Sequence, residues 1–350
     1  MKINLDKFVI SKKSRPLLIA EISCNHCGSL KLAKRIIKEA KKQGADFVKF
    51  QTYEPKNMTL KSNKRIFKID KGLWKGKKLW DLYNKAKTPF SWQKDLFQYA
   101  RKIKIPAFST PYDVSAVNLL EKLNCPIYKV ASFEVTDIPL IARISETKKP
   151  IILSTGMASL KEIDEAIKVI KKTKNNKFVI LYCVTNYPAR FRDFHLNNIK
   201  ILQKKYNCFV GLSDHSKDNA IASLAVGMGA KIFEKHVALK NQKKSFDIAF
   251  SLKGDEIGDF SKTIKYAWNS ISNENFKISS SQNLMKKYRR SIFITKNVKK
   301  NEIVTDENIA ILRPNGKGIQ PKYLKSVLGK KFKSNLPFGT ALKWKNIKSF

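Results

Sequence analysis

Short apolar runs alternate with amphipathic stretches along most of this chain, and the alternation repeats eight times between residues 17 and 270. The apolar runs are nearly continuous, which is typical of strands buried on both faces. They cover residues 17–23, 45–52, 106–112, 126–132, 150–156, 178–185, 208–216 and 231–239. Stretches between them, such as 30–43, 114–123 and 160–173, carry apolar side chains at helical spacing. Eight such units predict an α/β fold with a parallel (β/α)₈ TIM barrel, and a doubly wound open sheet is the structural alternative.

Two segments depart from this alternation. Residues 53–87 form a long connection between the second strand and its helix, which is typical of a lid or binding loop. After residue 270 the pattern ends, and the polar, Ser- and Asn-rich residues 271–285 indicate a linker. Residues 286–350 then show short strands and turns. We therefore expect a barrel domain over 1–270 and a small, mostly β domain over 286–350.

Composition limits the class of protein. Hydrophobic residues make up 43% of the 350, which indicates a globular chain, and no apolar run approaches the roughly 20 residues of a membrane span. The first residues lack a signal-peptide pattern, and the five cysteines have no framework spacing, so a cytoplasmic location is expected. The net charge of +42 suggests nucleic-acid binding, yet only ten of the seventy basic residues are Arg and they are spread over every helix. A solvated Lys-rich surface that attracts anionic substrates is the favoured interpretation, without a nucleic-acid or membrane partner.

Polar side chains follow the predicted strands at the end where TIM barrels carry their active sites. They are Glu21, Lys49, Gln51, Ser109, Thr110, Lys129, Ser132, Ser154, Thr155, Thr185, Asn186, Ser213, His215, Glu234 and His236. Any one of them could be a helix cap or a hydrogen-bonded core residue. Two buried lysines without an anion would be costly, however, so Lys49 and Lys129 indicate a phosphate or carboxylate ligand.

His215 and His236 end the seventh and eighth strands, which are neighbours in a barrel. They could share one exchangeable divalent cation such as Mn²⁺ or Mg²⁺, or both could be structural. Cys24 and Cys27 have zinc or redox spacing but no second pair, and we expect them to fill a loop.

Seven sequence blocks resemble, in order, the signature blocks of the sialic acid synthase family. The blocks are AEISCNHCGSL, VKFQTY, FSTPYD, YKVASFE, STGMAS, GLSDHS and FEKH. The blocks LRPNGKGIQP and LPFGTALKW are similar to the antifreeze-protein-like domain of that family, a SAF or β-clip fold. The 71–92 stretch and DIAFSL look most like the pseudaminic acid synthase branch. The resemblance implies condensation of phosphoenolpyruvate with an open-chain N-acetylated amino sugar, giving a nine-carbon sugar acid and phosphate.

The resemblance also implies roles for particular residues. Phosphoenolpyruvate would be held by Lys49, Thr110, Lys129, Ser132, Ser154 and Ser213. The divalent metal would be bound by His215 and His236. The sugar would be met by Gln51, Asn186, Tyr187, Asp247 and Arg313, and Glu21 and Glu134 would act in catalysis together with Lys129 and the two histidines. Arg313 would come from a partner subunit, which implies a domain-swapped homodimer.

Residues 237–247 depart from the common family pattern near the expected sugar-binding end. The acceptor could therefore be 2,4-diacetamido-2,4,6-trideoxy-altrose, N-acetylmannosamine as in N-acetylneuraminate synthases, or a related diacetamido sugar as in legionaminate synthases. A basic polyanion-binding protein is the alternative from a different class.

Overall fold

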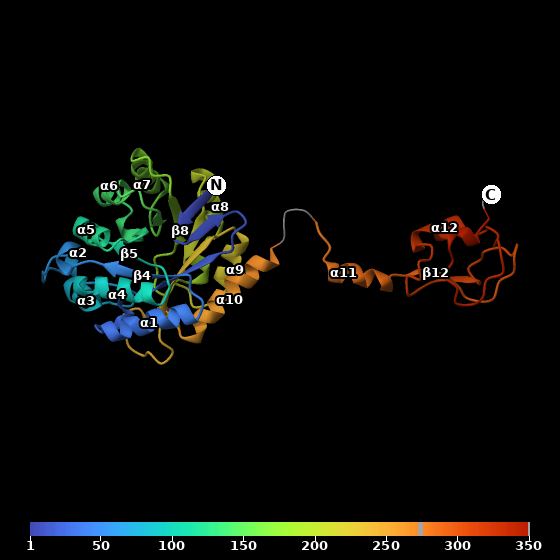
Figure 1. Cartoon of the computed structure of the whole chain (residues 1–350), viewed down its shortest axis with the longest axis horizontal. Coiled ribbons are helices and arrows are strands. Elements are labelled where there is room, and N and C mark those ends of the chain that lie inside the picture. The colour runs from blue at the N-terminus through green and yellow to red at the C-terminus, as the bar shows by residue number, and fades with distance from the viewer. Residues whose placement is uncertain (272–275, 349–350) are drawn as a thin grey trace. The chain divides into compact units, whose positions relative to one another are not determined.

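Eight parallel strands form a closed barrel in the computed structural model, which describes residues 1–271 and 276–348 (Figure 1). The strands are β3 (Leu17–Glu21), β4 (Phe47–Thr52), β5 (Ala107–Pro111), β6 (Tyr128–Val130), β7 (Ile151–Ser154), β8 (Phe178–Cys183), β9 (Val210–Ser213) and β10 (Ile232–Ala238). Each pairs with the next, and β10 pairs with both β9 and β3, which closes the ring. The predicted TIM barrel is confirmed, and the closing pairs rule out the open sheet.

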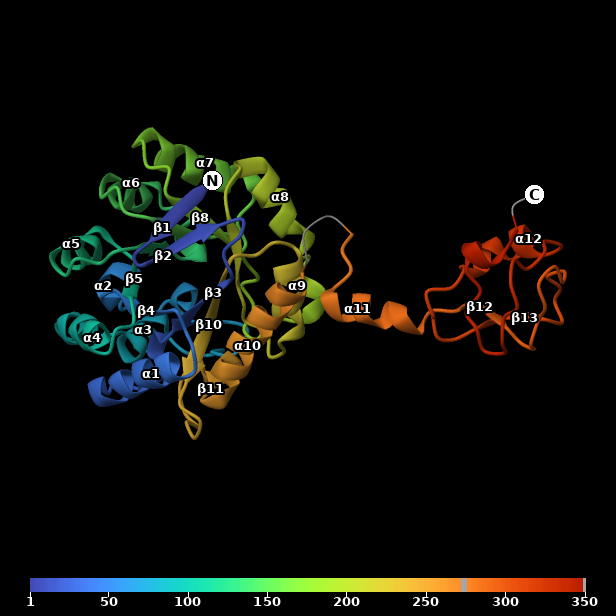
Figure 2. The same ribbon diagram turned by 45° about the vertical axis from the view of Figure 1, so that its right-hand side comes forward.

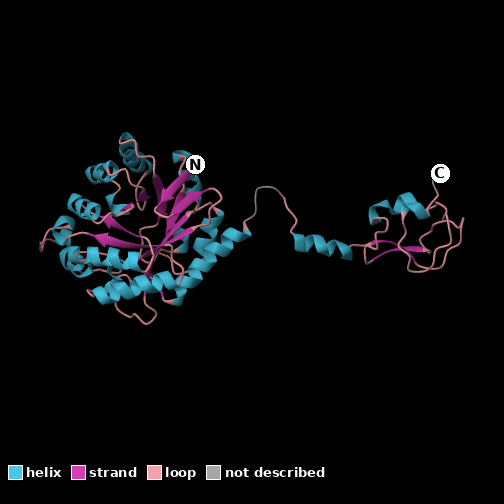
Figure 3. Cartoon of the chain, in the orientation of Figure 1, coloured by secondary structure: helices cyan, strands magenta, loops and turns pink. Residues whose placement is uncertain are grey.

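Helices surround the strands (Figure 3). They are α1 (Leu30–Lys42), α4 (Phe90–Lys102), α5 (Val114–Lys122), α6 (Ile138–Glu146), α7 (Leu160–Lys172), α8 (Asn197–Tyr206), α9 (Ala220–Gly227) and α10 (Asp255–Ser270). Local sequence fixes where several of them begin. Ser29 accepts a hydrogen bond from the amide of Leu32 at the start of α1, and Ser159 and Glu162 form a reciprocal capping box at the start of α7.

An N-terminal hairpin covers the end of the barrel opposite the predicted site. Its strands are β1 (Lys2–Leu5) and β2 (Phe8–Ser11), which lie side by side (Figure 2). The Phe8 ring packs 5.0 Å from that of Phe47 at the start of β4, and Lys231 donates hydrogen bonds to the carbonyls of Lys12 and Ser14. The hairpin therefore lies at the amino ends of the strands, away from the polar residues that follow their carboxyl ends.

The long connection after β4 has structure of its own. It contains α2 (Pro55–Met58), a 3₁₀ turn at Arg65–Phe67 and α3 (Leu79–Ala86). An ion pair of 2.9 Å between Lys87 Nζ and Glu54 Oε2 joins its two ends. A short strand, β11 (Leu252–Lys253), follows the loop after β10 and pairs with β10.

The chain divides into two compact units, Met1–Ile271 and Ser272–Phe350, each with its own hydrophobic core. In the second unit β12 (Ser291–Ile294) pairs with β13 (Ile309–Leu312), isolated bridges link its loops, and α12 (Leu324–Val327) is short. The linker predicted over 271–285 includes residues 272–275, which lie outside the described residues. It also contains a short helix, α11 (Ser280–Leu284), which begins at a capping box of Ser279 and Gln282 that the prediction overlooked. Among the described residues, no helix is both long and apolar enough to cross a membrane.

Candidate active site

A cavity of about 410 Å³ opens at the carboxyl ends of the barrel strands. Most of the predicted site residues line it: Glu21, Lys49, Gln51, Lys129, Ser132, Glu134, Ser154, Tyr187, Ser213, His215, His236 and Asp247. Thr110 stands behind Lys49 and accepts a hydrogen bond of 3.1 Å from its Nζ atom. The barrel thus gathers residues that are more than 200 positions apart in sequence, such as Glu21 and His236.

Lys49 is buried, but its charge is balanced within the chain. Its Nζ atom forms an ion pair with Glu21, and a second with Glu234 Oε1 at 3.7 Å. Burial alone would lower the pKa of Lys49, yet attraction by these two carboxylates outweighs it and raises the pKa. Contrary to our expectation, Lys49 does not need an anionic ligand to balance its charge, because Glu21 and Glu234 already supply negative charge.

Lys129 is the buried lysine that is still expected to bind an anionic ligand. Its side chain is buried, and Nζ donates to Ser154 Oγ at 2.6 Å and to the Val130 carbonyl at 3.0 Å. Within the described residues it makes no ion pair, and burial lowers the pKa of Lys129. An ammonium group beside a serine hydroxyl at the cavity floor is suited to the oxygens of a phosphate or carboxylate.

His215 and His236 face each other across the cavity, with ring centroids 5.6 Å apart. His215 Nδ1 lies 3.1 Å from the Val184 carbonyl, and His236 Nδ1 lies 3.3 Å from Asp247 Oδ2. The Val184 carbonyl favours a proton on His215 Nδ1, whereas Asp247 lies near His236 Nδ1 without forming a hydrogen bond. An imidazole with its proton on Nδ1 presents Nε2 as a metal ligand. Across residues 1–271 and 276–348 no group of three or more His, Cys, Asp or Glu residues could hold a metal. The pair therefore fits a cation whose other ligands come from water or substrate.

Glu134 ends a 3₁₀ turn, Ser132–Glu134, directly after β6. The residue is half-buried, but its Oε2 atom is buried and has no hydrogen-bond partner in the described residues. Burial raises the pKa of Glu134 to about 7, more than the nearby Lys129 ammonium lowers it. A neighbouring turn is shaped by Gly156, where φ is +48° and a Cβ atom would lie 2.3 Å from Ser132 Cβ.

One residue expected to meet the sugar, Asn186, is absent from the lining of this cavity in the barrel unit. Asn186 is exposed, and its Oδ1 accepts a hydrogen bond from the Tyr187 amide at 3.1 Å. Arg313 belongs to the second unit, just after β13, and is exposed there. Asp247 does line the cavity, although its Oδ2 atom also lies behind His236.

Several other residues that line this cavity were not predicted from the sequence. Cys24, which we expected only to fill a loop, lines it and contacts Ser245 Oγ at 3.8 Å. Phe250 packs against both histidine rings, with its ring centroid 4.9 Å from that of His236 and 5.9 Å from that of His215. The connection after β4 supplies an apolar wall: Met58, Ile69, Trp74, Leu79, Leu82 and Ala86. The signals in the sequence were the length of this connection and the family resemblance of its 71–92 stretch, because no single residue in it marks a site by its chemistry.

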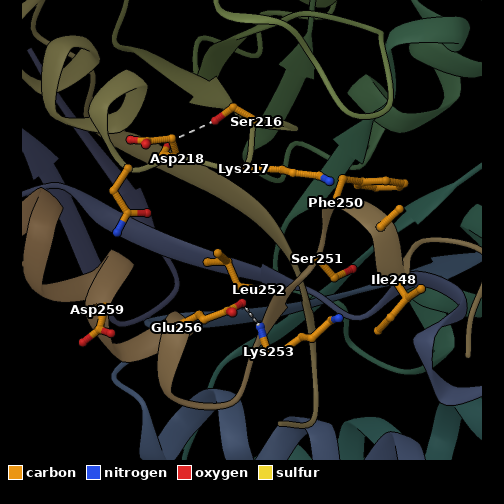
Figure 4. Close-up of a pocket in the computed structure, with 12 residues that line it drawn as sticks. Ser216, Lys217, Asp218, Ile248, Phe250, Ser251, Leu252, Lys253, Glu256 and Asp259 are labelled. Atoms are coloured by element: carbon orange, nitrogen blue, oxygen red, sulfur yellow. Dashed lines mark hydrogen bonds between the residues drawn. The ribbon is translucent and has the colours of Figure 1, made fainter. Parts of the chain in front are cut away.

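A second cavity, of about 550 Å³, also has Phe250 in its lining (Figure 4). Its lining is mainly polar and includes Lys217, Lys253, Glu256 and Asp259. In Figure 4 the Ser216 hydroxyl donates to the Asp218 carbonyl, at 3.1 Å, and Glu256 accepts from the Lys253 amide. His215 thus lines the first cavity, and the residues that follow it, Ser216 to Asn219, line the second.

Comparison with known proteins identifies the family. Residues 36–276 match the NeuB family, and residues 289–348 match the SAF domain. A pseudaminic acid synthase of Campylobacter jejuni is 38% identical over 326 residues, covering 93% of this chain and 95% of that protein. A pseudaminic acid synthase of Helicobacter pylori is 39% identical over 329 residues, covering 93% and 96%. The crystal structure of an N-acetylneuraminic acid (sialic acid) synthetase from Leptospira borgpetersenii, in complex with citrate, superposes with a TM-score of 0.73 at 30% identity, covering 81% of this chain and 94% of that one.

The resemblance read from the seven sequence blocks is confirmed, as is a SAF domain after the barrel. The chain belongs to the NeuB family.

Proposed function

We propose that this protein condenses phosphoenolpyruvate with the open-chain form of 2,4-diacetamido-2,4,6-trideoxy-altrose and water, giving pseudaminic acid and phosphate. Two relatives named pseudaminic acid synthases, matched along nearly their whole length, support this reaction. The observation that carries it is Lys129, a buried ammonium group without an ion pair among the described residues, on the floor of a cavity that also holds two facing histidines.

Phosphoenolpyruvate would lie at the polar floor of the cavity. Lys129 and Ser154 would hold one of its anionic groups, and Ser132 and Ser213 would donate further hydrogen bonds. Lys49, fixed by Thr110 and by the carboxylates of Glu21 and Glu234, would contribute positive potential rather than a free charge. Such pre-arranged donors would stabilise the negative charge that develops as phosphate leaves.

His215 and His236 would hold a divalent cation, Mn²⁺ or Mg²⁺, through their Nε2 atoms. When bound, such a cation supplies Lewis-acid polarisation of a carbonyl oxygen, here that of the sugar aldehyde. Asp247, 3.3 Å from His236 Nδ1, would orient that ring.

Glu134 is the proposed general base. The enol carbon of phosphoenolpyruvate attacks the aldehyde carbon of the sugar. Water adds to the carbon of phosphoenolpyruvate that bears the phosphate, and Glu134 accepts the proton that this water loses. That proton balances the one gained by the aldehyde oxygen when it becomes a hydroxyl group. The resulting tetrahedral centre then expels phosphate, and its hydroxyl proton leaves with the phosphate as the ketone forms.

The acceptor sugar would lie against the wall formed by the connection after β4. Trp74, Leu79 and Leu82 present apolar surface there, which suits the methyl group of a 6-deoxy sugar and the methyl groups of its acetamido substituents better than free hydroxyl groups. This wall is why we favour the trideoxy sugar over N-acetylmannosamine.

The test is to incubate the protein with phosphoenolpyruvate, Mn²⁺ and a panel of amino sugars, and to follow phosphate release and product mass. We expect turnover with the diacetamido-trideoxy sugar and much less with N-acetylmannosamine. The Lys129→Ala and His236→Ala variants are expected to abolish release. Full phosphate release by either variant, or none by the unmodified protein with any sugar, would refute the proposal. Tight, salt-sensitive binding to nucleic acid in place of turnover would favour the polyanion-binding alternative.

Arg313 completes the proposal. Since it is exposed in the second unit, we infer that it reaches the sugar of a partner subunit in a domain-swapped homodimer. A cytoplasmic location remains a prediction.

A further inference from the structure

A buried ion pair lies on the outer side of the barrel wall, behind the two histidines. Lys235 Nζ is 2.9 Å from Asp214 Oδ2, and the two side chains are 1% and 0% exposed. Neither residue lines the catalytic cavity, where their sequence neighbours Ser213, His215 and His236 are found. Alternate residues of a strand point to opposite faces, so the pair and the histidines occupy opposite sides of the same two strands.

The pair also fixes the backbone just beyond the end of β9. Asp214 Oδ1 accepts from the Ser216 amide at 2.8 Å, and Lys235 Nζ donates to the Ser216 carbonyl at 2.5 Å. The Asp214 amide donates to the Glu234 carbonyl at 2.9 Å. His215 therefore lies between two residues, Asp214 and Ser216, that are both tied to Lys235.

The direct pairing between β9 and β10 is short. The ladder between β9 and β10 has only two register pairs, Leu212 with Phe233 and Ser213 with Glu234. It ends two residues before His215. Beyond the ladder, the His215 carbonyl accepts from the Ala189 amide at 3.0 Å and His215 Nδ1 lies beside the Val184 carbonyl, so these contacts tie His215 to the segment after β8. The Asp214–Lys235 pair ties it instead to β10, the strand that carries His236.

We propose that Asp214 and Lys235 are positioning residues that set the separation of His215 and His236 and so determine the affinity of the site for its divalent cation. This inference rests on the proposed metal site. A purely stabilising role is a poor explanation, because apolar residues of similar volume often replace a buried ion pair without loss of stability.

The test uses the full-length double variant Asp214→Leu with Lys235→Met, which leaves no unpaired buried charge. Mn²⁺ binding is followed by the electron paramagnetic resonance signal of the free ion, and folding by circular dichroism. We expect a folded protein whose Mn²⁺ dissociation constant rises about tenfold, the usual effect of losing an outer-shell partner of a metal ligand. Unchanged affinity in the folded variant would overturn the proposal.

The matched control is the Arg15–Asp46 pair at the opposite end of the barrel, where Asp46 accepts from Arg15 at 2.6 and 2.9 Å and from the Leu18 amide. The double variant Arg15→Met with Asp46→Leu is expected to keep Mn²⁺ affinity, and an equal loss there would reduce the effect to general destabilisation and overturn the proposal. If the first variant does not fold, Asp214→Asn, which keeps the shape, must still weaken Mn²⁺ binding. Absence of Mn²⁺ binding that depends on His236 in the unmodified protein would instead remove the metal site itself, and this inference with it.

Discussion

Glu134 and Lys129 are two charged residues of the cavity whose surroundings favour their neutral forms. Burial raises the pKa of Glu134 to about 7, and burial lowers the pKa of Lys129. Glu134 can therefore take up a proton near neutral pH, as a general base must. Burial makes the charged form of Lys129 costly, and an anionic ligand would offset that cost.

The first prediction concerns Glu134. Its carboxylate form is present above a pKa of about 7 and is lost as the pH falls through that value, so kcat/KM should decline below pH 7 with the slope of one proton. Glu134→Gln should remove this acidic limb and lower kcat on the order of 10²- to 10⁴-fold. The measurement is the pH profile of phosphate release. Glu165→Gln, an exposed change on α7, should leave the profile unaltered.

The second prediction contrasts the two buried lysines. Lys129→Met removes a charge that has no ion pair among the described residues, so the melting temperature should hold or rise while kcat/KM for phosphoenolpyruvate falls by roughly 10²-fold or more. Lys49→Met leaves Glu21 and Glu234 without their shared cation, and it should cost about 3–5 kcal/mol of stability. Thermal melts and steady-state kinetics of both variants check this. Equal destabilisation by the two changes would contradict it.

The connection after β4 is the element on which acceptor choice depends. Trp74 packs at 5.5 Å from the Tyr187 ring, and its Nε1 donates to the Phe246 carbonyl at 3.0 Å. One residue thus links this connection to the loops after β8 and β10. The ion pair of Glu54 and Lys87 holds the two ends of the connection together.

The third prediction is that Trp74→Ala raises KM for the sugar by roughly tenfold, the loss expected for removing one large apolar contact, and leaves KM for phosphoenolpyruvate nearly unchanged. The apolar wall contacts only the acceptor in the proposed arrangement, which is the reason for the difference. Each KM is measured with the other substrate saturating. Leu60→Ala, an exposed change in the same connection, is the control, and an equal rise in both constants would contradict the assignment.

At the scale of the molecule, the chain has two units with separate cores, one built on the barrel and one on residues such as Ile292, Phe332 and Leu342. A unit with its own core can supply a residue to another subunit without losing its fold. The proposed role of Arg313 depends on this independence.

The fourth prediction tests the exchange of units. Lys129→Met and Arg313→Ala should each be inactive alone, while co-refolding equal amounts should restore roughly a quarter of full activity, because half of the dimers are mixed and each mixed dimer has one complete site. Phosphate release measures the recovery. No recovery, with mixed dimers demonstrated by differential tagging, would contradict an active site shared between subunits.

The chain's own pattern of residues was enough to predict the barrel, since eight apolar runs with helices between them have few other ways to bury their surface, and the polar residues that follow the strands had to meet at one end. Pairing partners could not be predicted in this way. The pattern cannot tell that Glu21 and Glu234 neutralise Lys49, that Lys129 makes no ion pair within residues 1–271 and 276–348, or that Asp214 and Lys235 meet behind the histidines. Glu21 and Lys49 come from successive strands, as do Asp214 and Lys235, but Glu234 reaches Lys49 because β10 closes the ring beside β3. The tertiary structure therefore decides which charges are balanced and which are left for a ligand.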